Sequence, residues 1–116
     1  MGSEMCIRDR AYVALRLAVD RLIAEGDLKG TPLTRPVAAV SVGVIEDQVM
    51  LDLCYEEDVR AETDMNVVMT NEGGIIEMQG TAEGKPFDRK QTDTMLDYSA
   101  AGIREIMRIQ EAVLSA

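Results

Sequence analysis

Acidic side chains gather in one short stretch of this chain. Five of them fall within nine positions: Glu56, Glu57, Asp58, Glu62 and Asp64. Strand-like apolar runs flank the stretch, so folding brings these like charges together at an electrostatic cost. Binding a divalent cation is the usual reason for such a cluster, because carboxylate oxygens suit hard cations. The stretch therefore predicts a cation site, and the structural alternative is a solvated turn between two strands.

The spacing of Asp58 and Asp64 constrains the backbone between them. On one continuous helix, residues six positions apart would point about 120° away from each other. Convergence on one ion therefore requires a short helix that ends near residues 62–64. Asp58 is then expected in its last turns, and Asp64 at the mouth of the next strand.

The residues before this stretch predict a helix and a hairpin. Apolar positions recur at helical spacing over 12–25 (Tyr12, Leu15, Val19, Leu22 and Ile23), and they predict an amphipathic helix before a polar connector at 26–35. The run VAAVSVGVI at 37–45 is apolar or small on both faces, which is typical of a central strand. A turn at Glu46 and Asp47 then leads into a second strand, QVMLDL.

The residues after it predict a second hairpin and a long helix. Residues 55–63 have helical character, MNVVMT and GIIEMQGT read as strands joined by a turn at 71–74, and a loop follows. Asp88 and Gln91 form a capping-box pattern for a helix that runs to about Leu114. Its expected buried stripe is Met95, Ile103, Ile106, Ile109 and Val113. Two antiparallel hairpins packed by helices make an α+β fold.

Composition sets the class of protein. At 116 residues, with 47% hydrophobic and 28% charged residues, the chain is long enough for one globular core. No apolar run has the length of a membrane span, and the two cysteines form no CxxC pair, so we expect a reduced cytoplasmic protein without membrane association.

The net charge of −9 argues against direct nucleic-acid binding by this segment. The absence of histidine excludes Ser-His-Asp triads and histidine metal sites.

Six motifs occur in an order that resembles one family. They are AYVAL, PVAAVSVGV, LDL-YEED, ETDMNVVMT, QGTAEG-PF and GIREIM-IQ-A, and they run from about Ala11 to the C-terminus. This order closely resembles the C-terminal half of ribonuclease PH, a phosphate-dependent 3′→5′ exoribonuclease that trims tRNA precursors and releases nucleoside diphosphates. The resemblance implies a ring-shaped hexamer of identical subunits that binds RNA. It also implies that inorganic phosphate is the co-substrate.

The resemblance assigns roles to particular residues. Asp58 and Asp64 match the two aspartates that the family uses for catalysis around Mg²⁺ (or Mn²⁺). The arginines that hold phosphate and RNA belong to the family's N-terminal half, and the Gly-Thr-Arg motif of that half is not in this sequence. For Glu56, Glu57 and Glu62 a surface role is expected. The Gln79-Gly80-Thr81 block is expected to serve close backbone packing.

Two expectations concern the limits of the resemblance. Residues 1–10 (MGSEMCIRDR) match no motif, so we expect a non-native or disordered leader outside the fold, with the domain at 11–116. A non-catalytic ring subunit of an exosome-like RNA-degrading complex is the alternative function. Retention of both Asp58 and Asp64 favours the catalytic class.

Overall fold

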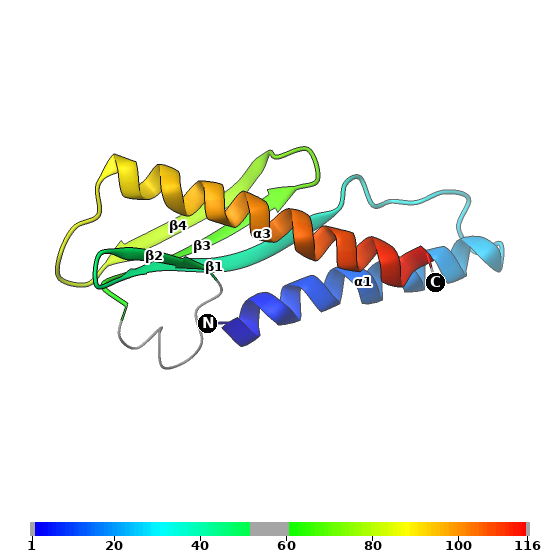
Figure 1. Cartoon of the computed structure of the whole chain (residues 1–116). Helices are drawn as coiled ribbons and strands as arrows, with labels where there is room; N and C mark the ends of the chain where they lie inside the picture. Colours follow the sequence, from blue (N-terminus) through cyan, green and yellow to red (C-terminus); the bar gives the residue numbers. More distant parts are fainter. Residues whose placement is uncertain (1, 52–60, 116) are drawn as a thin grey trace.

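The fold is an antiparallel sheet accompanied by two long helices. The computed structural model describes residues 2–51 and 61–115, with the side chains of the first helix from residue 8 onward. The described elements are α1 (Gly2–Ala24), β1 (Val37–Ile45), β2 (Gln48–Leu51), β3 (Thr63–Thr70), β4 (Ile75–Ala82) and α3 (Arg89–Ser115). The strands lie in the order β2-β1-β3-β4, and α3 crosses one face of the sheet (Figure 1). The predicted α+β class, with its two hairpins, is confirmed.

Strand β1 is the centre of the sheet, as its two apolar faces predict. It pairs with β3 along residues 37–44 and with the shorter β2 along residues 42–45. All of its residues except Val37 are buried. Val42 and Val44 face α3 and pack in one core with Met65, Val67 and other buried residues of β3 and α3. Burial on both faces follows from a run of small and β-branched side chains.

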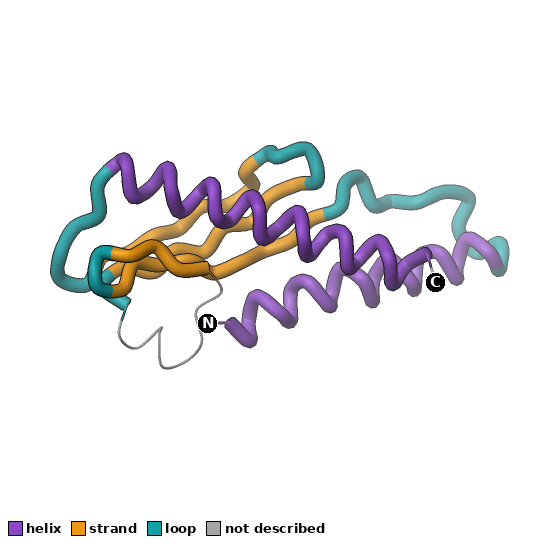
Figure 2. Tube along the Cα trace, viewed as in Figure 1, coloured by secondary structure: helices purple, strands orange, loops and turns teal. Residues whose placement is uncertain are grey.

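The two hairpins turn where the sequence predicts. The β1–β2 turn consists of Glu46 and Asp47, whose φ angles of 52° and 63° are left-handed; this matches the type I′ geometry that suits two-residue hairpins. The β3–β4 turn contains Gly73 at a φ of 86°, a value that glycine adopts without strain. Figure 2 shows both connections as short loops between adjacent strands.

Strand β3 begins at Thr63, so Asp64 is its second residue. The expected position of Asp64 at the mouth of a strand is therefore confirmed. The backbone is already in the sheet one residue earlier, because the Glu62 N–H donates to the Val44 carbonyl at 2.9 Å. Most of the short helix expected at 55–63 lies outside the described residues, and residues 61–63 are not helical.

The start of α3 is the predicted capping box. The Gln91 N–H donates to Asp88 Oδ1 at 2.7 Å, and the Asp88 N–H donates to Gln91 Oε1 at 3.0 Å. Two amides that the helix itself leaves unpaired are thereby satisfied. The helix reaches Ser115, close to the predicted end at Leu114.

The expected buried stripe on α3 is correct only in its first half. Met95 and Ile103 are at most 2% exposed, whereas Ile109 and Val113 are each 50% exposed. The prediction is wrong for these two residues because the helix extends beyond the strands that its first turns cover (Figure 1). An apolar stripe therefore continues past the surface that buries it.

Helix α1 begins at Gly2, ten residues before the predicted start at Tyr12. Residues 2–10 were expected outside the fold, but Asp9 Oδ1 accepts a hydrogen bond from the Ala39 N–H at 2.8 Å. The prediction that these residues lie outside the fold is therefore wrong for Asp9. The helix continues through them because no proline or internal glycine interrupts it after Gly2. The non-native origin of these residues stays a prediction.

The predicted apolar stripe of α1 is partly exposed. Tyr12 and Val19 are buried, but Leu15 and Leu22 are 52% and 39% exposed. The stripe prediction is wrong for the two leucines because, at about 100° per residue, they lie about 60–80° around the helix from Tyr12, whereas Val19 lies about 20° from it. Within the described residues, neither helix combines the length and apolar character needed to cross a membrane.

Candidate active-site face of the sheet

Asp64 lies on the sheet face opposite α3. Its β3 neighbours Met65 and Val67 belong to the core beneath α3, and side chains alternate between the two faces of a strand. The residues directly opposite Asp64 are Gly43 on β1 and Thr81 on β4. Its side chain is therefore flanked by a glycine and a small hydroxyl side chain, and it is partly buried.

A second polar row lies beside Asp64 on the same face. Ser41 of β1 pairs with Asn66 of β3, which pairs with Gln79 of β4. Ser41 is fully buried, Asn66 is partly buried and Gln79 is exposed. Sequence reasoning missed Ser41 and Asn66 as functional candidates. The available signal was a single polar residue in the otherwise apolar strand VAAVSVGVI, and an asparagine between Met65 and Val67 in TDMNVVMT.

Of the other four acids in the cluster, the structure describes Glu62. Asp58, together with Glu56 and Glu57, lies outside the described residues, so its convergence with Asp64 stays a prediction. Glu62 lies at the entry to β3, where its backbone pairs with Val44 and with the Glu83 N–H. No group of three or more histidine, cysteine, aspartate or glutamate side chains within the described residues has the arrangement to hold a metal ion.

Gly80 confirms the packing role expected for the Gln79-Gly80-Thr81 block. A Cβ atom at this position would lie 3.0 Å from Met65 Cε and 3.4 Å from Phe87 Cζ. The strand therefore needs a residue without a side chain there, because α3-side core atoms already fill the space. Gln79 and Thr81 point to the opposite face, which they share with Asp64.

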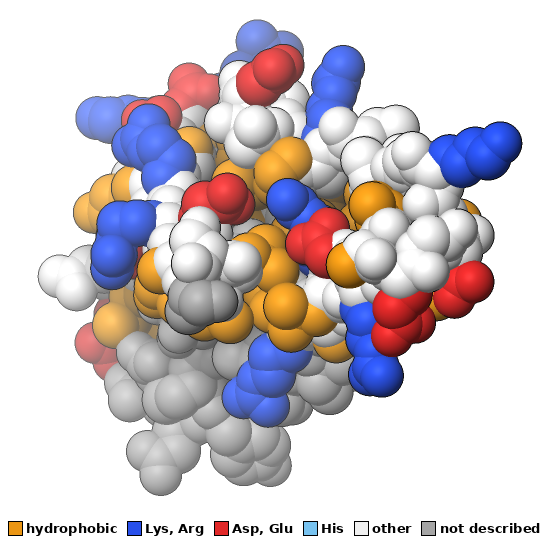
Figure 3. Space-filling model, turned by 90° about the vertical axis from the view of Figure 1, so that its right-hand side faces the viewer, with side chains coloured by type: hydrophobic (Ala, Val, Ile, Leu, Met, Phe, Trp, Pro, Cys, Tyr) orange, Lys and Arg blue, Asp and Glu red, His pale blue; other side chains and the backbone are white. Residues whose placement is uncertain are grey.

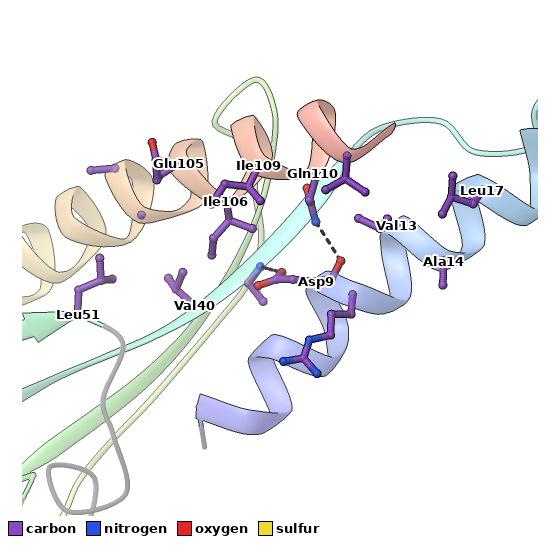
Figure 4. Close-up of a pocket in the computed structure, with 15 residues that line it drawn as sticks. Asp9, Val13, Ala14, Leu17, Val40, Leu51, Glu105, Ile106, Ile109 and Gln110 are labelled. Carbon is purple, nitrogen blue, oxygen red and sulfur yellow. Dashed lines mark hydrogen bonds between the residues drawn. The ribbon is translucent and has the colours of Figure 1, made fainter. Parts of the chain in front are cut away.

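An apolar groove lies between α1, β1 and α3. Its volume is about 870 Å³, and its lining includes Val13, Leu17, Val40, Ile106 and Ile109 (Figure 4). Figure 3 shows hydrophobic side chains gathered on one end of the molecule, with charged side chains around them. A contiguous apolar surface of this kind is uncommon on an isolated domain and marks an interaction surface.

Four polar or charged residues lie among the apolar lining of the groove: Asp9, Arg10, Glu105 and Gln110. The Gln110 Nε2 atom donates to the Asp9 carbonyl at 3.2 Å and to the Val37 carbonyl at 3.4 Å (Figure 4). Arg108 donates a hydrogen bond to Glu105 and, with its charge, lowers the pKa of that carboxyl. Glu105 therefore stays ionised at the edge of the groove. Gln110 is 5% exposed, and its Oε1 atom has no hydrogen-bond partner within the described residues.

The fold and the polar sheet face define the class of protein: an α+β domain of the ribonuclease PH type. The family model described as "3′ exoribonuclease family, domain 2" matches residues 35–102, which is more than half of the chain. The chain belongs to this family and corresponds to the C-terminal half of a ribonuclease PH-like protein.

Solved structures share this fold at low sequence identity. An archaeal exosome core is 20% identical with a TM-score of 0.61, over 69% of this chain and 32% of that chain. Rice (Oryza sativa) Rrp46 is 20% identical with a TM-score of 0.64, over 73% of this chain and 40% of that one. An Archaeoglobus fulgidus exosome with RNA bound to the active site is 21% identical with a TM-score of 0.58, over 74% and 35%. The chain thus spans 32–40% of the length of these structures.

Proposed function

We propose that this chain supplies the carboxylate-bearing half of a phosphorolytic 3′→5′ exoribonuclease subunit that trims the 3′ ends of tRNA precursors. The observation that carries this proposal is the position of Asp64, on the polar face of the sheet in a domain of the 3′ exoribonuclease family. Of the two aspartates implied by the resemblance, Asp64 is the one within the described residues.

The proposed reaction breaks one phosphodiester bond and forms one phosphoanhydride bond. An oxygen of inorganic phosphate attacks the phosphorus of the last nucleotide, and the bond from that phosphorus to the preceding 3′ oxygen breaks. The 3′ oxygen takes up a proton, and the last nucleotide leaves as a nucleoside diphosphate. Both reactants are anions, so alignment and charge neutralisation are the main catalytic tasks.

Mg²⁺ or Mn²⁺ is the cation that we propose for this face, held by Asp64 together with Asp58. Mg²⁺ is commonly bound by one or two carboxylates plus substrate phosphates, so a single described carboxylate fits it. Asn66 and Ser41 lie on the same face of the sheet, but their side-chain oxygens are buried, so Asp64 is the described residue that would contact the cation. When bound, the cation would neutralise charge on the reacting phosphates.

RNA binding and ring assembly are proposed for the complete subunit. With a net charge of −9, this chain offers little electrostatic attraction for RNA. The phosphate- and RNA-binding arginines are therefore assigned to an N-terminal half, as the resemblance implies. The apolar groove supports this arrangement, because it provides a surface on which further protein can pack. A homohexameric ring is proposed for the assembled subunits.

The exposed groove leads to a prediction for the chain on its own. Purified alone, it is expected to self-associate or to bind a hydrophobic dye, because Ile109 and its neighbours expose apolar surface. Ile109→Asp should lower dye fluorescence and the associated fraction in sedimentation. Ile75→Asp is the matched control, since both isoleucines are 50% exposed and Ile75 lies on β4, outside the groove lining. A monomer without dye binding would contradict the proposed role of the groove.

The test of the function is phosphate dependence. Joined to the N-terminal half of a family member, the chain is expected to shorten a tRNA precursor from its 3′ end only when inorganic phosphate is present. The product should be nucleoside diphosphate, identified by chromatography. Nucleoside monophosphate released without phosphate would identify a hydrolase and contradict the proposal.

A non-catalytic ring subunit is the second candidate function. The fold is shared with archaeal exosome cores and with Rrp46, so an exosome-like ring subunit fits it equally well. In the same assay this candidate predicts incorporation into a ring that binds RNA, with no shortening in the presence of phosphate and Mg²⁺.

A further inference from the structure

A second, smaller pocket lies between α1 and the connector that follows it. The connector, residues 25–36, returns from the end of α1 to the start of β1 (Figure 1). The pocket has a volume of about 270 Å³, and its lining includes Arg16 and Asp20 of α1 and Thr34 and Arg35 of the connector. It shares no lining residue with the apolar groove. The two sides of the pocket therefore come from segments that meet only through the fold.

Arg16 is held in place on the helix side of this pocket. Its Nε atom donates to Asp20 Oδ1 at 3.3 Å, since residues four positions apart lie on one face of a helix. A hydrogen bond to Tyr12, together with the charge of Asp20, raises the pKa of Arg16, so the guanidinium stays charged. The contact to Asp20 uses Nε, whereas the terminal nitrogens carry four of the five N–H donors of a guanidinium. Donors therefore remain for a further acceptor.

Arg35 brings a second positive charge from the connector side. Its side chain is exposed, and it forms no hydrogen bond or ion pair with any residue in the described part of the chain. The pocket is thus lined by two guanidinium groups and one carboxylate, in a chain whose net charge is −9. A local excess of positive charge on an acidic protein attracts an anion to that place.

We propose that this pocket binds the phosphate group of a small anion through Arg16 and Arg35. A phosphate group carries a charge of about −1.5 to −2 near pH 7, and its oxygens can accept paired N–H bonds from two guanidinium groups at once. The Thr34 hydroxyl can donate a further hydrogen bond. The volume is at the lower end for ligand pockets, which favours a small anion over a nucleic-acid strand. The inference does not depend on the exoribonuclease proposal, because these residues lie outside the sheet face of Asp64.

The test is binding of inorganic phosphate by the chain itself, followed by amide NMR at constant ionic strength. The signals of residues 12–23 and 31–36 should shift as phosphate is added. Arg35→Ala should weaken phosphate affinity on the order of 10-fold, because charge-assisted hydrogen bonds are lost. Arg35→Lys keeps the charge without the planar fork, so it should recover part of that loss.

Arg104→Ala is the matched control for the loss of charge. Arg104 is exposed on α3 and does not line the pocket, so this variant changes the net charge of the chain by the same amount as Arg35→Ala. Its phosphate affinity should equal that of wild type. Equal weakening by the two variants, or shifts spread over the arginines and lysines of the whole surface, would show unspecific attraction and overturn the proposal.

Adenosine and its diphosphate show which part of a ligand the pocket recognises. Adenosine diphosphate should shift the same signals as inorganic phosphate, whereas adenosine, which lacks phosphate, should shift none of them. Tighter binding of the diphosphate than of inorganic phosphate would support a nucleotide as the source of the phosphate group, and equal binding would support the free ion. Shifts produced by adenosine alone would identify a pocket for apolar groups and overturn the proposal.

Discussion

Asp64→Asn is expected to reduce phosphate-dependent shortening of a tRNA precursor on the order of 100-fold or more. The substitution removes one negative charge but keeps the size of the side chain, so the sheet should fold unchanged. Asp64 lies between Gly43 and Thr81 on the polar face, where the proposed cation and the reacting phosphates require a carboxylate. The measurement is the rate of nucleoside diphosphate release by the chain joined to an N-terminal half.

Asp97→Asn is the matched control for this prediction. Asp97 lies exposed on α3, so the same loss of charge at that position should leave the rate within a factor of about two. Circular dichroism should show the same fold for both variants. A rate for Asp64→Asn equal to that of the control would remove this aspartate from the mechanism.

Met95→Ala is expected to lower the free energy of unfolding by about 2–5 kcal/mol. Met95 is fully buried in the core between α3 and the sheet, and the truncated side chain would leave a cavity among residues that cannot fully close it. Single domains are typically stable by about 5–15 kcal/mol, so the loss is a large share. The measurement is the midpoint of urea unfolding by circular dichroism.

Met78→Ala separates this cavity effect from the loss of a methionine in general. Met78 lies on β4 and is 48% exposed, so its truncation should cost less than about 1 kcal/mol. Equal midpoints for the two variants would show that α3 does not pack on the sheet as described.

Local interactions explain the parts of the fold that the sequence predicted well. The reciprocal hydrogen bonds of Asp88 and Gln91 join residues three positions apart, and the two-residue turn at Glu46 and Asp47 needs only its neighbours. Likewise, the alternation of polar and apolar residues in β3 places Asp64 and Met65 on opposite faces once a strand is assumed. These features depend on short spacings that a single sequence displays.

The place of Asp64 near the start of a strand was predictable from the residues around it, and the structure confirms it. Its selection among the five acids came from the family resemblance, and its role stays a prediction. The position of Ser41 opposite Asn66 was not predictable, because it depends on the register between β1 and β3. Register between strands that are distant in sequence is determined by packing, and a shift of one residue would turn Ser41 to the other face.

By itself, the sequence determined the hairpins, the cap of α3, the central position of β1 and the α+β class. Tertiary structure decided where the apolar stripes end and which polar atoms are buried. Ile109 and Val113 continue the pattern of α3 but lie half exposed, and Asp9 reaches the Ala39 amide although its segment matches no motif. The physical reason is that hydrophobic periodicity reports which face of an element can be buried, whereas burial itself depends on how far the neighbouring element extends.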